Sequence, residues 1–419
     1  MKLSERQKLL VHLQKLFKYF VVFGDKRHAE IIAEMRCAVL STRYLSARPK
    51  YNVVSRVQGY WQSYLMDMPD DQFHLETRCD KRSFLCIMDL IADDSVFVSS
   101  GTKPQRPICI QLFCALQCLG HDGTGNSGGI ISGQKGIGRG TVSNYFQRIV
   151  SALFRLRDRV IVWPSLKTRL AHSARTLDKY GFAAFCVLDG THVYFSQAPA
   201  VDPHQFWTRK KGKYGLLVQL LADFDWNIIG YVVGWPGCTS DITAYENSIY
   251  YTDYKLFFGD LYCLADKGYN LHTSCLVPYL EPEIEGNSER NLFNDGIKKG
   301  RLLIERINAM LKNRFVFLKG MRMQVKQKHG GGQFVDFEAA NRICVACFVL
   351  HNVMNVCHDR WPDDTPPACD AYANAYQALL GDVAGSSSSE SASQFRELQL
   401  QLHSEWHARQ FYTPSFARM

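Results

Sequence analysis

The apolar run FAAFCVLDGTHVYF at 182–195 restricts the fold of this chain more than any other segment. A run of this length predicts a central β-strand, because a strand buried on both faces carries apolar residues almost without interruption. Asp189 interrupts the run, and an unpaired carboxylate in such a place costs several kcal/mol. We therefore expect Asp189 to have a partner or a function that offsets its burial.

The segments that follow predict more strands and short helices. GLLVQLLADF at 215–224 and IIGYVVGW at 228–235 flank the turn DWN and predict a β-hairpin. CTSDITAYENS predicts a short helix capped by Thr239 or Ser240, and LYCLADKGYN predicts a strand that ends near Asp266. Mixed strands followed by a helix indicate an α/β core with acidic residues at strand ends.

The helix predicted over LLIERINAMLKNRF, at 302–315, lies in a segment with an unusual charge pattern. Between positions 298 and 328 the single acid is Glu305, and ten residues are basic: Lys298, Lys299, Arg301, Arg306, Lys312, Arg314, Lys319, Arg322, Lys326 and Lys328. A nuclease that binds the DNA backbone needs cations around a small acidic centre, and this segment has that pattern. The formal net charge of +9 also favours a polyanionic partner, with nucleic acid as the leading candidate.

Asp189, Asp266 and Glu305 together suggest a site for divalent cations. Mg²⁺ prefers a few carboxylates, water and phosphate oxygens, and two ions about 4 Å apart can activate a nucleophilic oxygen and stabilise a leaving oxygen. Mn²⁺ is the expected substitute. Each acid also has a simpler role: Asp189 could cap the turn DGT, and Asp266 could hold the turn DKGY. Glu305 could pair with Arg301 one helical turn earlier. The basic surroundings favour the metal site over these three separate roles.

Residues 101–160 are predicted to form a helix-turn-helix-like DNA-binding region. The apolar helix 108–119 is followed by a Gly-rich connection and by a helix over 136–154, with Thr141 as its N-cap. The apolar stripe of the second helix comprises Val142, Phe146, Ile149, Val150 and Leu153, whereas Arg139, Ser143, Asn144 and Arg148 point elsewhere and suit contacts with DNA. A structural helical hairpin with a solvated face explains the same pattern equally well.

The rest of the sequence sets limits on domains and environment. With 419 residues, 46% of them hydrophobic, the chain can bury a large core; we expect a helical region over 1–100 and an extension over 356–419 with a Ser-rich linker. The end of that extension predicts an amphipathic helix for a partner or dimer, or else a frayed tail.

Fourteen scattered cysteines indicate a reducing compartment, and no apolar run reaches the roughly 20 residues of a membrane span. CVAC at 344–347 is expected to lie in the core rather than to bind zinc, and His192 to be a hydrogen-bonded core histidine.

Five motifs occur in an order that resembles the DDE endonuclease domain of PIF/Harbinger transposases and their domesticated relatives. The motifs are VLDGTHV, FWTRKKGKYGLLVQLLADFDWNIIGYVVGWPGCTSDITAYENS, LADKGYN, LLIERINAMLKNRF and CFVLHNVMN, and the resemblance covers 182–355. It implies an α/β, RNase H-like fold with a mixed sheet flanked by helices. The first acid is expected on the first strand, the second after the fourth strand, and a Glu on a following helix. An all-helical N-terminal region with a helix-turn-helix is expected ahead of this domain.

Matched motif by motif, the resemblance implies that Asp189, Asp266 and Glu305 are the catalytic and metal-binding residues. Asp241, in PGCTSD, competes for the second position. We expect a supporting role for it, because it lies in a predicted helix whereas Asp266 ends a strand. TRKKGKYG matches a further stretch of the family and suits phosphate contacts, with a solvated loop as the alternative. The DNA contacts predicted for this domain are Arg209, Lys210, Lys211, Lys213, Arg306, Lys312 and Arg314.

The resulting hypothesis is a DNA transposase that cleaves and joins strands by two-metal-ion phosphoryl transfer. The resemblance further implies action in the nucleus, recognition of terminal inverted repeats, a homo-oligomer and a separate Myb/SANT-like partner protein, with no role for a membrane. One alternative is a domesticated, catalytically silent nuclear module that binds DNA or protein with the same fold. Another is a metal-dependent nuclease of DNA repair that acts on no transposon ends.

Overall fold

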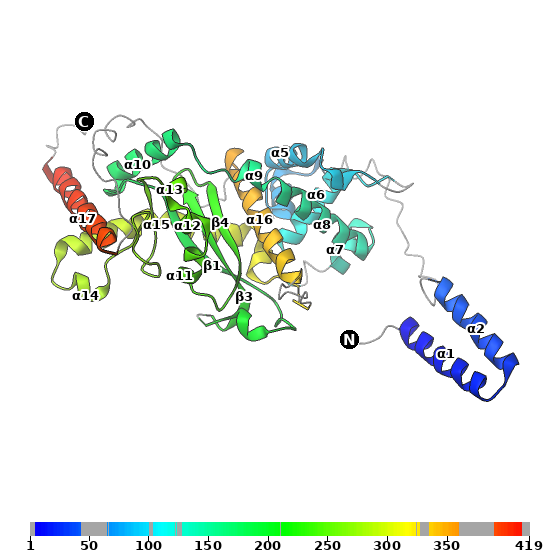
Figure 1. Ribbon diagram of the computed structural model, residues 1–419. Helices are drawn as coiled ribbons and strands as arrows, with labels where there is room; N and C mark the ends of the chain where they lie inside the picture. Colours follow the sequence, from blue (N-terminus) through cyan, green and yellow to red (C-terminus); the bar gives the residue numbers. More distant parts are fainter. Residues whose placement is uncertain are drawn as a thin grey trace. The chain divides into compact units, whose positions relative to one another are not determined.

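The computed structural model describes residues 5–42, 65, 67–99, 104–121, 123, 128–209, 211–323, 325–326, 335–359 and 389–412. Its contacts divide the chain into two compact units, Met1–Val57 and Gln58–Met419. In the first unit, helices α1 (Glu5–Val22) and α2 (Lys26–Ser41) form a hairpin (Figure 1). Asp25 caps α2 by accepting a hydrogen bond from the backbone N–H of His28, which satisfies one of the free N–H groups at the helix start. This part of the predicted N-terminal region is therefore helical.

The second unit is built on a six-stranded mixed sheet. Its strands are β1 (Ala184–Tyr194), β2 (Trp207–Thr208), β3 (Lys213–Asp223), β4 (Ile228–Pro236), β5 (Tyr262–Leu264) and β6 (Cys275–Leu276). β1 lies in the middle of the order β2-β3-β1-β5-β6, antiparallel to β3 and parallel to β5, and β4 pairs antiparallel with β3. The central strand and the β-hairpin predicted from the sequence are both confirmed.

The alternative role of Asp189 as the cap of a DGT turn does not hold, because β1 continues through Asp189 to Tyr194. Asp189 pairs with Leu220 of β3 in the middle of the ladder. The residues of β1 before Asp189 are fully buried, whereas Asp189 and the three residues after it are only half-buried. The apolar first half of β1 thus lies in the core, and Asp189 is the first residue of β1 that is partly exposed.

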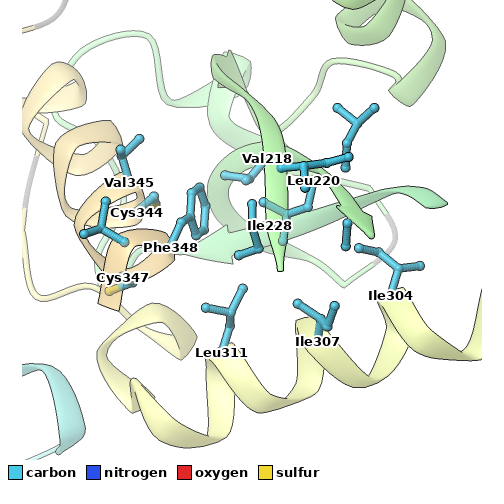
Figure 2. Packing of buried hydrophobic residues seen from close by; sticks show 14 of the residues in the cluster. Val218, Leu220, Ile228, Ile304, Ile307, Leu311, Cys344, Val345, Cys347 and Phe348 are labelled. Carbon is cyan, nitrogen blue, oxygen red and sulfur yellow. The ribbon is translucent and has the colours of Figure 1, made fainter. Parts of the chain in front are cut away.

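Helices pack around this sheet and continue beyond it. They are α4 (Asp70–Thr77), α5 (Lys81–Ile91), α6 (Ile108–Gly120), α7 (Gly128–Lys135), α8 (Arg139–Arg155), α9 (Arg157–Val160), α10 (Leu166–Tyr180), α11 (Asp241–Glu246), α12 (Ile249–Thr252), α13 (Tyr254–Phe257), α14 (Glu281–Ile284), α15 (Ser288–Arg314), α16 (Val335–Val356) and α17 (Ser389–Tyr412). α15 packs against the sheet through its buried residues Ile304, Ile307 and Leu311, which point toward Val218 and Leu220 of β3 (Figure 2). The spacing of these three residues gives α15 one apolar face and leaves its other faces for polar groups.

α16 is a core helix. Phe348 points from α16 toward the sheet, and Cys344, Val345 and Cys347 are buried beside it (Figure 2). Both cysteines are fully buried free thiols, which confirms that CVAC belongs to the core. Within the described ranges, α16 is also the one helix long and apolar enough to cross a membrane, but 72% of its apolar window is buried inside the protein, as expected for a core helix.

In the described part of 101–160, four helices, α6 to α9, are present where two were predicted. α7 forms within the Gly-rich connection, and a short turn with Gly136 at φ 62° separates it from α8. α8 begins at Arg139 with Gly138 as its N-cap, so the N-cap predicted at Thr141 is wrong. Its apolar stripe is confirmed, since Val142, Ile149, Val150 and Leu153 are buried and Phe146 is half-buried. Ile131 of α7 packs against Val142, which holds the two helices together.

The C-terminal helix α17 packs against its own domain. The indole N–H of Trp406 donates to the carbonyl of Asp178 at 3.0 Å, and Arg396 pairs with Glu283 at 2.6 Å. The ring of His403 stacks on Phe182 with 4.7 Å between centroids, and burial lowers the pKa of His403 to about 4. The predicted helix is therefore present, and its described part is not a frayed tail.

Candidate active site

The register of two parallel strands brings the two predicted aspartates together. Val187 of β1 pairs with Leu264, the last residue of β5, so Asp189 lies two residues further along β1 and Asp266 lies two residues beyond the end of β5. Side chains two residues apart on a strand point to the same face. Glu305 comes from the middle of α15, which packs on β1, β3 and β5. The three acids thus converge from three separate parts of the sequence.

Arg301 lies between these acids. Its Nη2 is 3.1 Å from Asp189 Oδ1 and 3.9 Å from Asp266 Oδ2, and its Nη1 is 3.8 Å from Glu305 Oε1. The Arg301 side chain is only 13% exposed, so it does not extend into solvent. One guanidinium is therefore the cation shared by all three carboxylates.

Asp189 is the most deeply buried of the three acids. Its side chain is 16% exposed, and its second oxygen accepts a hydrogen bond from Asn308 Nδ2 at 2.9 Å. Burial raises the pKa of Asp189 to about 6, since removal of water disfavours the charged carboxylate. The positive charge of Arg301 opposes this rise in the pKa, and the nearby negative charges of Asp266, Asp241 and Glu305 add to it.

Asp266 and Glu305 form the more open part of the site. Their side chains are 37% and 52% exposed. Asp266 Oδ1 also accepts a hydrogen bond from the backbone N–H of Gly268 at 2.7 Å, so it holds the DKGY turn as well. The simpler roles predicted for Asp266 and Glu305 are both present, and neither prevents the two acids from facing Arg301. The hydrogen bond from Gly268 fixes the orientation of the Asp266 carboxylate.

Asp241 lies against a different face of β1. A Cβ built on Gly190 would come within 1.9 Å of Asp241 Oδ1, and Gly190 faces away from Asp189 because successive residues of a strand alternate. On that face, Gln219 donates from Nε2 to the Asp241 carbonyl at 2.7 Å and to the Tyr269 hydroxyl at 3.2 Å. Asp241 begins α11 directly after the N-cap Ser240, so one of the two predicted caps is confirmed. This position supports Asp266, rather than Asp241, as the acid grouped with Asp189 and Glu305.

A polar stripe on α15 joins the site to Lys312. Arg301, Glu305, Asn308 and Lys312 are spaced by four, three and four residues, which places them on one face of the helix. The ammonium of Lys312 donates to the hydroxyl of Thr191, two residues after Asp189 on β1, and burial lowers the pKa of Lys312 to about 8. Asn308 and Thr191 were not predicted as site residues from the sequence. Asn308 could have been predicted, because it lies three residues after Glu305 on the same face of the helix.

The predicted DNA contacts near the sheet fall into two groups. Arg209, Lys211 and Lys213 are exposed on the hairpin of β2 and β3, and Arg306 is exposed on α15; Lys210 lies outside the described residues. Arg314 does not fit the prediction: it is 4% exposed, and its Nη2 donates to the Asp359 carbonyl at 2.8 Å. A guanidinium held inside the fold cannot reach a phosphate.

The predicted DNA contacts of α8 are partly accessible. Arg139, Ser143 and Asn144 are exposed near its N-terminus. Arg148 is half-buried and donates from Nη1 to Gln111 Oε1 of α6 at 3.4 Å.

His192, in the sheet, lies 3.2 Å from the Gly237 carbonyl through Nε2, as expected for a hydrogen-bonded core histidine.

The site contains suitable donors for a hard divalent cation, but they are not arranged as a closed ligand set. Among the described residues, no three or more His, Cys, Asp or Glu side chains group as metal ligands would. The carboxylates of Asp189, Asp266 and Glu305 nevertheless converge on one cation, Arg301. Their oxygen chemistry fits Mg²⁺ or Mn²⁺, provided that the guanidinium moves.

A mixed α/β domain with converging carboxylates is consistent with the class of metal-dependent nucleases. Residues 188–352 match the family model described as DDE superfamily endonuclease, and this segment includes Asp189, Asp266 and Glu305. The match supports the DDE superfamily for this domain, and with it nuclease activity of the transposase type, DNA binding and the use of divalent metals. No curated protein and no solved structure matches the chain.

Proposed function

We propose that this chain is a PIF/Harbinger-type transposase that cleaves and joins DNA strands at the Asp189, Asp266 and Glu305 site. The observation that carries the proposal is the convergence of these three carboxylates on one cation from β1, from the end of β5 and from α15. Three carboxylates gathered around one base repel one another, so such a cluster is stabilised by further cations.

The order of the strands supports an RNase H-like fold. Without the two-residue β2, the order is β4-β3-β1-β5-β6, with β3 antiparallel to both of its long neighbours. The first acid then lies on the first strand, β1, and the second acid follows the fourth, β5. Glu305 lies on a later helix, α15. These are the three positions that the resemblance implies.

The chemistry of the proposed site divides between the metal ions and the protein. Two Mg²⁺ ions bound by the carboxylates would activate the attacking oxygen and stabilise the leaving oxygen. The protein holds Asp189 in place through Asn308 and the β1 ladder, and it holds Asp266 through the turn at Gly268. Lys312 lies beside Thr191 and supplies a positive charge at the inner end of the site.

Exposed cations support DNA as the substrate. Arg209, Lys211 and Lys213 on the β2–β3 hairpin and Arg306 on α15 are accessible to phosphates. The predicted helix-turn-helix region contains α6 and α8, with α7 between them, and the exposed Arg139, Ser143 and Asn144 at the start of α8 support DNA contacts by this region. Recognition of terminal inverted repeats, action in the nucleus, a homo-oligomer and a Myb/SANT-like partner protein belong to this proposal.

One observation favours the second candidate, a catalytically silent module that binds DNA or protein. Arg301 already neutralises part of the acidic charge that metal ions would otherwise compensate. A domain that never binds metal would be stable in this form, whereas an active one must release the guanidinium.

Nicking of supercoiled plasmid in Mn²⁺ by the wild type, Glu305→Gln and Glu289→Gln separates these candidates. Glu289 is exposed in the first turn of α15 and serves as the control, since it lies on the same helix outside the acid cluster. We expect the wild type and Glu289→Gln to nick, and Glu305→Gln to be inactive with an unchanged circular dichroism spectrum. Equal nicking by all three proteins would exclude Glu305 as a catalytic residue, and no nicking by any of them would favour the silent module.

A further inference from the structure

Arg301 lies between the three acids, but most of its contacts are longer than those of a tight ion pair. One of its three contacts, with Asp189 at 3.1 Å, is a hydrogen bond, while the distances of 3.9 Å to Asp266 and 3.8 Å to Glu305 are longer. Its Nε is buried without a hydrogen-bond partner in the described part of the chain. A buried donor left unpaired is unfavourable, so the guanidinium is held centrally but not tightly.

We propose that Arg301 is an exchangeable occupant of this site, which holds the three acids together until divalent cations displace it. The inference rests on the proposed metal-dependent function. It adds that the affinity for metal is set by competition with a residue of the same chain.

The competition follows from the geometry of Asp189. One oxygen of Asp189 faces Arg301 at 3.1 Å and the other faces Asn308 at 2.9 Å, so both oxygens already have donors. A Mg²⁺ ion needs an oxygen at about 2.1 Å and keeps other ligands around it. An ion bound to the oxygen that faces Arg301 would lie close to the guanidinium, so the two positive charges repel each other and compete for Asp189.

The competition also follows from the charges. Three carboxylates share the single positive charge of Arg301, so the cluster keeps a negative charge that attracts a second cation. An arginine cannot lose its proton in a protein, so it can leave the cluster only by turning its side chain outward. Each binding event must then include the cost of breaking the Arg301 contacts.

Binding of Mn²⁺ to the full chain, measured by titration calorimetry without DNA, tests this inference independently of cleavage. Arg301→Gln removes the competing charge, while Lys298→Gln removes one charge from an exposed position three residues earlier on α15. We expect Arg301→Gln to bind Mn²⁺ about tenfold more tightly than the wild type, and Lys298→Gln to stay within about twofold. Equal or weaker binding by Arg301→Gln would overturn the inference, because Arg301 would then organise the ligands instead of competing with the metal.

Thermal unfolding with EDTA and with Mn²⁺ gives a second readout. In EDTA, Arg301→Gln is expected to melt below the wild type because its acids lose their shared cation, and Mn²⁺ is expected to raise its melting temperature more than that of the wild type.

If Arg301→Gln does not fold, Arg301→Lys keeps the charge but loses the forked guanidinium, and it is also expected to bind Mn²⁺ more tightly than the wild type. Failure of every variant to bind Mn²⁺ would overturn this inference and the metal-dependent function together; tight binding by Arg301→Gln without plasmid nicking would overturn the function alone.

Discussion

Asp189 combines the energetic cost of a buried carboxylate with a place in the acid cluster. It sits in a central strand, where its pKa rises to about 6 because burial disfavours the charged form. The folded state therefore holds a proton on Asp189 more tightly than the unfolded chain does, where the pKa is near 3.8. The stability that this proton contributes is fully present below about pH 4 and is lost as the pH rises through about 6.

Asp189→Asn should therefore change the pH dependence of stability in EDTA. The variant cannot ionise at this position, so its free energy of unfolding should rise relative to the wild type between about pH 4 and pH 7. A shift of about two pKa units corresponds to a change on the order of 3 kcal/mol between the two ends of this range. Urea unfolding at several pH values measures this difference, and a difference that does not vary with pH would contradict the assigned pKa.

At the scale of elements, α15 connects the site to the C-terminal helix. Its polar stripe, with Arg301 and Asn308, faces the acids, while Gly296 faces α17. A Cβ at Gly296 would lie 2.6 Å from Cε2 of Phe182 and 2.8 Å from Nε2 of His403. The glycine is thus needed for the close approach of α15 to Phe182, just before β1, and to α17, although glycine is a poor helix former.

Gly296→Ala should loosen α17 from the domain. Overpacking of this kind costs about 1–3 kcal/mol, which exceeds the gain of about 1 kcal/mol in helix propensity. Hydrogen exchange over 389–412 should become faster, and the midpoint of urea unfolding should fall. Gly133→Ala in α7 is the matched control, because a Cβ there meets nothing within 4 Å and should raise stability slightly. Unchanged exchange over 389–412 in Gly296→Ala would show that α17 is not held by this contact.

At the scale of the whole molecule, the two compact units differ in how they bury apolar surface. The α1–α2 hairpin buries few residues, among them Leu13 and Ala29, whereas the core of the second unit runs continuously from α4 to α17. Two helices alone are marginally stable in water, since most helical stability comes from tertiary packing. The second unit should therefore fold without the first.

Removal of residues 1–57 should leave the unfolding of the remainder almost unchanged. The stability of residues 58–419 comes from contacts within that unit. Its melting temperature should stay within a few degrees of that of the full chain, as measured by calorimetry. A large drop in the melting temperature would mean that the hairpin stabilises the second unit directly.

The sequence alone determined the parts of the structure that depend on local periodicity. The central strand around Asp189, the hairpin of β3 and β4 and the burial of CVAC follow from apolar patterns over fewer than about fifteen residues, whereas the choice of Ser240 over Thr239 as a cap was left open. α7 was missed because a Gly-rich segment has little helix propensity of its own and forms here by packing Ile131 on α8.

Only the tertiary structure decided which charges face one another. Arg301 and Arg314 lie on the same helix in the same basic segment, yet Arg301 joins three acids and Arg314 pairs with Asp359, 45 residues away. Helical spacing places Arg314 on the same face as Ile307 and Leu311 and Arg301 on the polar stripe, but the partner of each guanidinium depends on elements distant in the sequence. The same reason explains α17, whose docking partners Asp178 and Glu283 belong to α10 and α14. The sequence therefore specified the acids and the elements that carry them, and the packing of α15 on β1 and β5 decided that Arg301 is their common partner.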